Sequence, residues 1–275
     1  MNRTQKIRAV ADGGLMLALA TILSIVTIFK MPFGGGVTLF SMLPIGIYAY
    51  RYKTPQALVV AVLFGLIQML IGLKNFSYVS GIGSYAVVAI FDYILAFGVL
   101  GFSGMFKKVK RTPAIIISAV LILCTVALFT VALLSSGDKD MIAELKSRWW
   151  IIALEAGVIV VLTIFALIFQ KKATASSVTI ATGLAVTGVL RFVCHFISGV
   201  TVWSEYAADR TAVMYSLYYN LSYMIPEIIL SVLMAAIISN LLNFDAETMD
   251  VIWKDDSKVK KLWDDEEPAE NDKAE

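Results

Sequence analysis

Charged side chains are scarce in this chain of 275 residues, at 16% of the sequence, and histidine occurs only once. Hydrophobic residues make up 59% and the mean hydropathy is +0.79, whereas a globular domain has ~45–50% apolar and ~25% charged residues. A soluble protein of this composition would expose large apolar patches to water. Lipid is therefore the natural solvent for most of the surface, and the composition predicts a polytopic membrane protein.

The sequence lacks the residues that nucleic-acid binding, metal binding, ATP binding and common hydrolytic mechanisms require. The net charge of +2 leaves no basic excess for binding nucleic acid. Cys124 and Cys194 both lie in apolar runs and form neither a disulfide framework nor a metal knuckle. No Walker-type glycine-rich loop and no H-E-x-x-H pair is present. Cys194 and His195 are adjacent, so they face different sides of a helix. The sequence therefore indicates no enzyme, no metal site and no cofactor.

Eight apolar runs are long enough, or nearly so, to span a bilayer, which takes ~20 residues. The run at 37–50 is short and contains Pro44. Lysine and arginine are more frequent in one set of alternate connections than in the other, so the positive-inside rule predicts that both termini lie in the cytoplasm. The runs are 9–29, 37–50, 55–73, 82–105, 113–135, 149–169, 177–200 and 213–242.

Ionisable side chains inside such runs are expensive, at roughly 2.5–3.5 kcal/mol each, and each is a hypothesis for a functional site. At a rise of ~1.5 Å per residue, Asp92, Arg191, His195 and Asn220 come out roughly 8–15 Å below the outer ends of three different runs. Groups at a similar depth predict one pocket that opens outward. The ionisable residues inside the runs are Asp92, Glu155, Arg191, His195 and Glu227.

Spacing along two runs places further groups on common faces. Arg191 and His195 are four residues apart and share a helical face, as do Asn220 and Glu227, which are seven apart. Aromatic residues crowd the outer ends of these two runs: Trp203, Tyr206, Tyr215, Tyr218, Tyr219 and Tyr223. A carboxylate beside indole and phenol faces favours a flat cationic heteroaromatic ligand. The same residues also fit a structural interpretation, with aromatic belts at the interface and Arg191 paired with Asp92 or Glu227.

Four segments resemble a known family. Residues 32–44, PFGGGVTLFSMLP, are similar to the P-x-G-G-S-[IV]-T-L-x-S-M-x-P signature of the thiamine-specific substrate-binding (S) component of energy-coupling factor transporters. Residues 91–97, FDYILAF, resemble its L-[DE]-Y-P-L-A-F stretch. Residues 191–206, RFVCHFISGVTVWSEY, and 215–227, YSLYYNLSYMIPE, resemble its last two motifs. Gly36 and Ile94 depart from the serine and the proline of these patterns.

The resemblance implies an all-α integral membrane protein with a six-helix core and two inserted transmembrane helices. Helices 1–4 of the core would occupy residues 1–105 and helices 5–6 residues 177–243. The inserted pair would occupy 106–176, and 244–275 would be an acidic cytoplasmic tail without stable structure. The protein would lie in a bacterial plasma membrane.

The resemblance also implies a function and its residues. The chain would capture thiamine from outside and work with a transmembrane coupling subunit and two ATP-binding subunits. Asp92 would face the aminopyrimidine and Trp203 would stack on a thiamine ring. By the same resemblance, the hydrogen-bonding and wall residues would be His195, Tyr215, Asn220 and Tyr93, with possible support from Arg191, Glu227, Tyr219 and Phe33.

The coupling subunit would pack on Gly14 and Ala18, whose spacing permits close helix contact in lipid. Two alternatives remain open. One is an S component for a related pyrimidine or thiazole precursor, and the other is a membrane assembly or sensor protein without transport activity.

Overall fold

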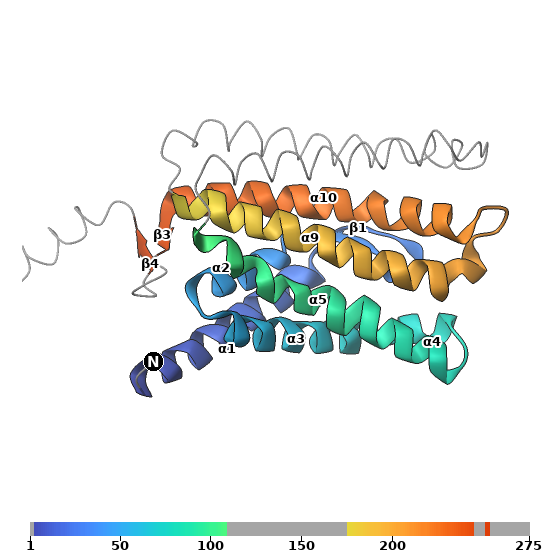
Figure 1. Cartoon of the computed structure of the whole chain (residues 1–275), viewed down its shortest axis with the longest axis horizontal. Coiled ribbons are helices and arrows are strands. Elements are labelled where there is room, and N and C mark those ends of the chain that lie inside the picture. The colour runs from blue at the N-terminus through green and yellow to red at the C-terminus, as the bar shows by residue number, and fades with distance from the viewer. Residues whose placement is uncertain (1–2, 109–174, 245–250, 254–275) are drawn as a thin grey trace, which may run out of the picture.

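The structure is a computed structural model and describes residues 3–108, 175–244 and 251–253. In these residues the long helices run side by side along the long axis of the molecule (Figure 1). The α-helices are α1 (Arg3–Ile25), α2 (Met42–Arg51), α3 (Thr54–Ile71), α4 (Ile82–Val87), α5 (Ala96–Gly98), α9 (Ala175–Thr201) and α10 (Ala212–Leu241). The π-helix η3 (Val88–Leu95) and the 3-10 helix η4 (Val99–Lys108) continue α4 and α5, and the other 3-10 helices are η1 (Pro32–Gly34), η2 (Leu73–Tyr78) and η6 (Trp203–Tyr206).

Five helices of the described part are long and apolar enough to cross a membrane, and the short α2 is the sixth helical segment of the bundle. This confirms the expected all-α membrane architecture. The five are Arg3–Ile25, Thr54–Ile71, Ile82–Lys107, Val178–Thr201 and Ala212–Ile238. The two predicted spans at 113–135 and 149–169, with Glu155, lie outside the described residues.

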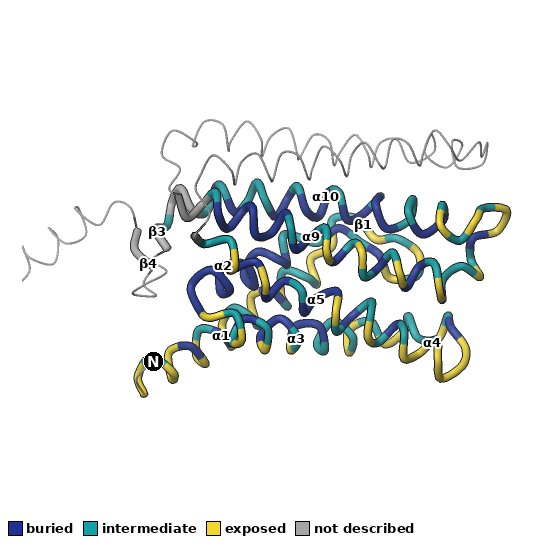
Figure 2. Tube along the Cα trace, in the orientation of Figure 1, coloured by how far each residue is buried: buried dark blue, intermediate teal, exposed yellow. Residues whose placement is uncertain are grey.

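The expected span at 37–50 is wrong as a membrane-crossing helix. Only Met42–Arg51 is helical, which at ~1.5 Å per residue is about 15 Å, half of the ~30 Å hydrocarbon core. All ten of these residues are buried (Figure 2). The run is apolar because α2 is covered by protein on every side, a case that hydropathy alone cannot separate from a short span.

The first predicted run, 9–29, also ends early as a helix. α1 stops at Ile25, and the β-branched residues that follow form β1 (Thr27–Lys30), which pairs antiparallel with β2 (Gly36–Thr38). The three glycines of residues 27–38, a segment named the strap from here on, favour a flexible loop. The strap instead forms a short two-stranded ribbon with η1 at its tip.

The C-terminal tail has one described element. β3 (Leu242–Phe244) pairs with β4 (Val251–Trp253), whose Val-Ile-Trp sequence favours a strand within an otherwise acidic segment. The expectation of a tail without structure is therefore corrected for these three residues, and residues 245–250 and 254–275 lie outside the described part.

Polar contacts fix α1 on the rest of the bundle at the end that holds the N terminus (Figure 1). The guanidinium of Arg51 lies 2.8 Å from the carboxylate of Asp12, and the Tyr52 hydroxyl donates to the same oxygen at 2.5 Å. The Tyr48 hydroxyl donates to the carbonyl of Ala9 at 3.0 Å. α1 is thus held on α2 at this end, while much of its outer face is exposed apolar surface suited to lipid (Figure 2).

Candidate ligand-binding site

A cavity of about 700 Å³ lies between the strap, the end of α3, η2, η3, α9 and α10. It is lined by all six residues expected to bind ligand: Asp92, Tyr93, His195, Trp203, Tyr215 and Asn220. Arg191, Tyr219 and Phe33 line it as well, whereas Glu227 lies behind the wall. The volume is within the ~300–1,000 Å³ of small-molecule sites. Residues from distant parts of the sequence therefore meet in one chamber.

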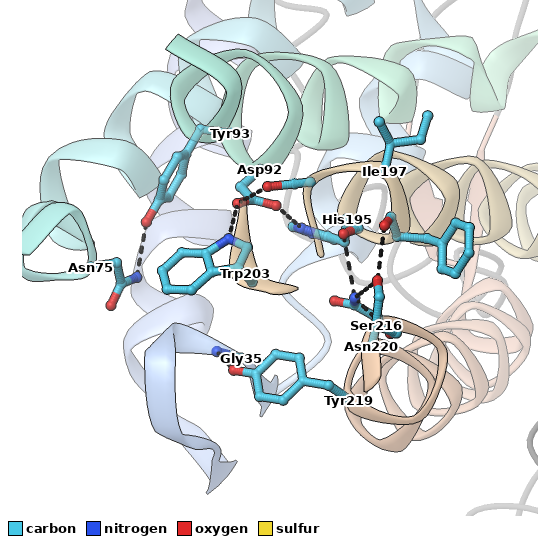
Figure 3. A network of polar contacts seen from close by, with 12 residues as sticks. Gly35, Asn75, Asp92, Tyr93, His195, Ile197, Trp203, Ser216, Tyr219 and Asn220 are labelled. Atoms are coloured by element: carbon cyan, nitrogen blue, oxygen red, sulfur yellow. Dashed lines mark hydrogen bonds and ion pairs between the residues drawn. The ribbon is translucent and has the colours of Figure 1, made fainter. Parts of the chain in front are cut away.

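Asp92 is the centre of a hydrogen-bond network (Figure 3). Its carboxylate lies 3.0 Å from His195 Nδ1 and accepts from Trp203 Nε1 at 3.0 Å. The hydroxyl of Ser198, which is fully buried, donates to it at 2.7 Å. These three donors hold the carboxylate in one orientation and stabilise its charged form.

One ring nitrogen of His195 has no hydrogen-bond partner among the described residues. With Nδ1–H donating to Asp92, Nε2 is an acceptor, and it is buried without a hydrogen-bond partner in the described part of the chain. A buried acceptor that lacks a partner is costly. In a cavity wall, such an atom suits a donor on a ligand.

The π-helix η3 explains how two adjacent residues, Asp92 and Tyr93, both line the cavity. π-helical turns are rare and frequently occur at functional sites, because the wider turn redirects side chains. The Tyr93 hydroxyl accepts from Asn75 Nδ2 at 2.9 Å and lies 3.3 Å from the carbonyl of Gly72, to which it donates. Tyr93 is thus fixed as a wall residue.

Aromatic rings from the strap, η2 and η6 gather at one side of the chamber, where Phe33, Tyr78 and Trp203 line it and Tyr206 packs against Phe33. The ring centroid of Phe33 lies 4.3 Å from that of Tyr206, 5.3 Å from that of Tyr78 and 6.0 Å from that of Trp203. Phe33 adopts a left-handed backbone conformation with φ of 64°. This wall of rings offers stacking and cation–π surface to a flat ligand.

The tip of the strap is tied to α10 by Tyr219. The Tyr219 hydroxyl accepts from the backbone N–H of Gly35 at 2.9 Å and donates to the carbonyl of Pro32. A Cβ on residue 35 would lie 2.8 Å from that hydroxyl, so only glycine permits this approach. Figure 3 shows Tyr219 and Gly35 meeting on the side of the network opposite Asp92.

Asn220 and Tyr215 have different surroundings from those expected. The Asn220 amide nitrogen lies within 2.9–3.3 Å of the His195 carbonyl and of the carbonyl and hydroxyl of Ser216, and its oxygen accepts from Tyr223. Both ends of this amide are engaged by protein, so here Asn220 joins α9 to α10. Tyr215 lines the cavity with its ring stacked on Tyr219 at 5.9 Å.

Sequence reasoning missed Ser198 and the strap contacts, and it also missed Asn75 and Gln68, which line the cavity. Ser198 follows His195 by three residues and so shares its helical face, which is a signal present in the sequence. Asn75 and Gln68 lie in a segment without a recognisable motif. No three His, Cys, Asp or Glu side chains gather to hold a metal within the residues that the structure describes.

The two residues expected to contact a partner lie away from the cavity. Gly14 and Ala18 are exposed on α1, and a Cβ on residue 14 would meet nothing within 4 Å. The neighbouring Gly13 instead faces the bundle, where a Cβ would lie 3.1 Å from Val60. The small residues at 14 and 18 therefore leave an open face on α1.

Comparison with known proteins gives three similarities. Thiamine transporter ThiT of Bacillus subtilis (strain 168) is 25% identical over 233 residues, which are 84% of this chain and 89% of the relative. A solved structure of ThiT from Listeria monocytogenes has the same fold, with a TM-score of 0.50 at 19% identity over 86% of this chain and 93% of that one. A family model described as Thiamine transporter protein matches residues 10–244. Because this match takes in most of the sequence, the chain belongs to the thiamine transporter protein family.

Proposed function

We propose that this chain is the thiamine-binding S component of an energy-coupling factor transporter, which captures thiamine from outside and releases it inward. Membership of a transporter family confirms that the chain is a transporter and not an enzyme. The observation that carries the proposal for the site is the Asp92 carboxylate, oriented by three donors beside the Trp203 and Phe33 rings.

Thiamine joins an aminopyrimidine to a positively charged thiazolium ring, and each part has a counterpart in the cavity. Asp92 accepts from the aminopyrimidine, and the acceptor nitrogen of His195 takes a second donor. Trp203 and Phe33 offer the stacking surface. Tyr215 and Asn220 add hydrogen bonds, which for Asn220 requires one of its present bonds to protein to be exchanged.

Thiamine binding by the purified chain, followed by quenching of tryptophan fluorescence, tests the site. We expect Asp92→Asn and Trp203→Phe each to weaken binding, the first by loss of charge and the second by loss of the indole donor. Glu205→Gln is the matched control, because Glu205 is an exposed acid two residues from Trp203 that does not line the cavity. Unchanged affinity in both site variants would refute the assignment.

Competition with hydroxymethylpyrimidine distinguishes thiamine from its precursors. An aromatic pyrimidine without the thiazolium ring keeps the contacts proposed for Asp92 and His195 and loses the cation–π part. We therefore expect it to compete only weakly with thiamine. Tighter binding of the precursor would assign the chain to that substrate.

Coupling to a transmembrane subunit and two ATP-binding subunits is the second part of the proposal. Exposed Gly14 and Ala18 support it, because small residues four apart allow another helix to approach closely in lipid. We expect Gly14→Leu to retain thiamine binding and to abolish uptake in cells that carry the ATPase subunits. Gly83→Leu, on an open face of α4, is the control. Uptake that continues without those subunits would refute coupling.

The orientation proposed for the chain follows from its charges. Lysine and arginine favour the connections on the side of the N terminus, which supports an orientation with both termini in the cytoplasm. The membrane proposed is the bacterial plasma membrane. The cavity lies toward the opposite end of the bundle, so this orientation opens it to the outside.

A further inference from the structure

The cavity proposed to bind positively charged thiamine is itself lined by a positively charged side chain. Arg191 lines it with a side chain that is 9% exposed, and the guanidinium lies over the Phe97 ring at 4.3 Å. Its Nε and Nη1 have no hydrogen-bond partner among the described residues. An uncompensated guanidinium at this depth would repel thiamine and oppose the attraction of Asp92.

Glu227 is the acid nearest to this guanidinium. Its Oε1 lies 4.0 Å from Arg191 Nη1, and its side chain is 1% exposed. The Thr38 backbone N–H donates to Oε2 at 2.5 Å, the Thr38 hydroxyl donates to Oε1 at 2.6 Å, and the Ser41 hydroxyl lies 3.3 Å from Oε1. Donors on both oxygens and a nearby guanidinium are the partners of an ionised carboxylate.

The buried charges around the chamber therefore sum to one negative charge, from Asp92 and Glu227 against Arg191. Lys30 and Lys74 also border the chamber but are exposed to water, which screens them. We propose that Glu227 is a specificity-determining residue that cancels the charge of Arg191, so that the charge of Asp92 remains uncompensated and, together with the aromatic rings, favours a monocation. The inference rests on the proposed function and adds to it a residue that does not touch the ligand.

The test compares two ligands of one shape, thiamine and its neutral analogue in which carbon replaces the quaternary nitrogen. The measured quantity is the ratio of their affinities for the full-length protein, determined by titration calorimetry. We expect Glu227→Gln to lower the preference for thiamine by roughly tenfold, because at an effective dielectric constant of ~20 a unit charge changes the affinity for a cation by about 15-fold even at a separation of ~10 Å. If Glu227→Gln changed only the shape of the cavity, it would weaken the binding of both ligands and leave the ratio of their affinities unchanged.

Thr38→Val is the matched control, because it removes the hydroxyl bond between the strap and Glu227 and keeps every charge. We expect the two affinities to change together in this variant. Arg191→Gln should raise the ratio, and the double variant of Arg191 and Glu227 should return it toward the wild-type value. If Glu227→Gln does not fold, Arg191→Gln decides alone.

The outcomes separate this inference from the proposed function. A wild-type protein that binds neither ligand refutes the function itself. A wild-type protein that binds thiamine, with a ratio that neither charge variant moves, refutes only the role of Glu227. A ratio that changes equally in Thr38→Val also refutes it, because that variant alters contact and not charge.

Discussion

Removing the hydroxyl of Tyr219 should speed the exchange of thiamine. This single group accepts from Gly35 and donates to Pro32, and these bonds tie the tip of the strap to α10. The strap forms one wall of the cavity, and its tip is held by these two bonds and by the ring contacts of Phe33, so we expect it to move when ligand enters or leaves. Tyr219→Phe keeps the ring and its stacking on Tyr215 and loses only the two bonds.

The magnitude follows from those bonds. A neutral hydrogen bond contributes ~0.5–1.5 kcal/mol, so two amount to ~1–3 kcal/mol. The contact with Pro32 is exposed to water, which favours the lower half of that range, ~1–2 kcal/mol, a rate increase of about 5- to 30-fold. We expect the two bonds to restrain the strap both with and without ligand, so entry and exit should accelerate together, and the dissociation constant should change less than either rate.

Stopped-flow tryptophan fluorescence measures both rates. Tyr218→Phe is the matched control, since it removes a hydroxyl from the adjacent residue of α10, which does not line the cavity. Its ring, over which Arg210 lies, is retained. Rates in Tyr219→Phe that equal those of wild type, in a folded protein, would refute the idea that this hydroxyl restrains the strap.

Three further variants test packing and polar contacts. Gly199→Ala should destabilise the fold by roughly 1–3 kcal/mol and lower the thermal midpoint, because a Cβ there would lie 2.1 Å from the Ser216 hydroxyl. Gly83→Ala is the control, and an equal midpoint in the two variants would contradict this prediction. Ser198→Ala removes the hydrogen bond to the charged Asp92 carboxylate, and such a bond contributes ~1.5–3 kcal/mol. Thiamine binding should therefore weaken about tenfold or more in a fluorescence titration. Unchanged affinity would show that Asp92 is oriented without Ser198. Asp12→Asn removes the charge from the 2.8 Å pair with buried Arg51. It should cost about 1.5–3 kcal/mol in thermal unfolding, the contribution of a hydrogen bond to a charged group, while thiamine affinity at low temperature stays as in wild type. Loss of affinity in that variant would link α1 to the cavity.

Hydropathy is reliable for the long helices of this chain and unreliable for its short apolar segments. The run that forms α10 is long enough that only a membrane helix or a buried helix could explain it. Residues 37–50 are also largely apolar but are divided between β2 and the buried α2. Apolar composition reports that a residue avoids water, and it does not tell whether lipid or protein replaces the water.

Charge and spacing are the features that predict the candidate site. Inserting an ionisable side chain into a membrane-spanning run costs free energy. This cost by itself identifies Asp92, His195 and Arg191 as candidate site residues. Ser198, Asn75 and Gln68 carry no such mark, because an uncharged polar residue in a helix costs little and occurs in many structural roles. Their part in the site depends on what faces them.

The sequence by itself determined that the chain belongs in a membrane, where the five long helices of the described part lie, and which side chains are too costly to be there without a partner. These are properties of composition and of periodicity along one segment. The tertiary structure decided the pairing, with Asp92 on Ser198 and Trp203, Glu227 against Arg191, and Tyr219 on the strap. These contacts join residues up to 187 positions apart, and their distances follow from how the helices pack, which no local pattern encodes.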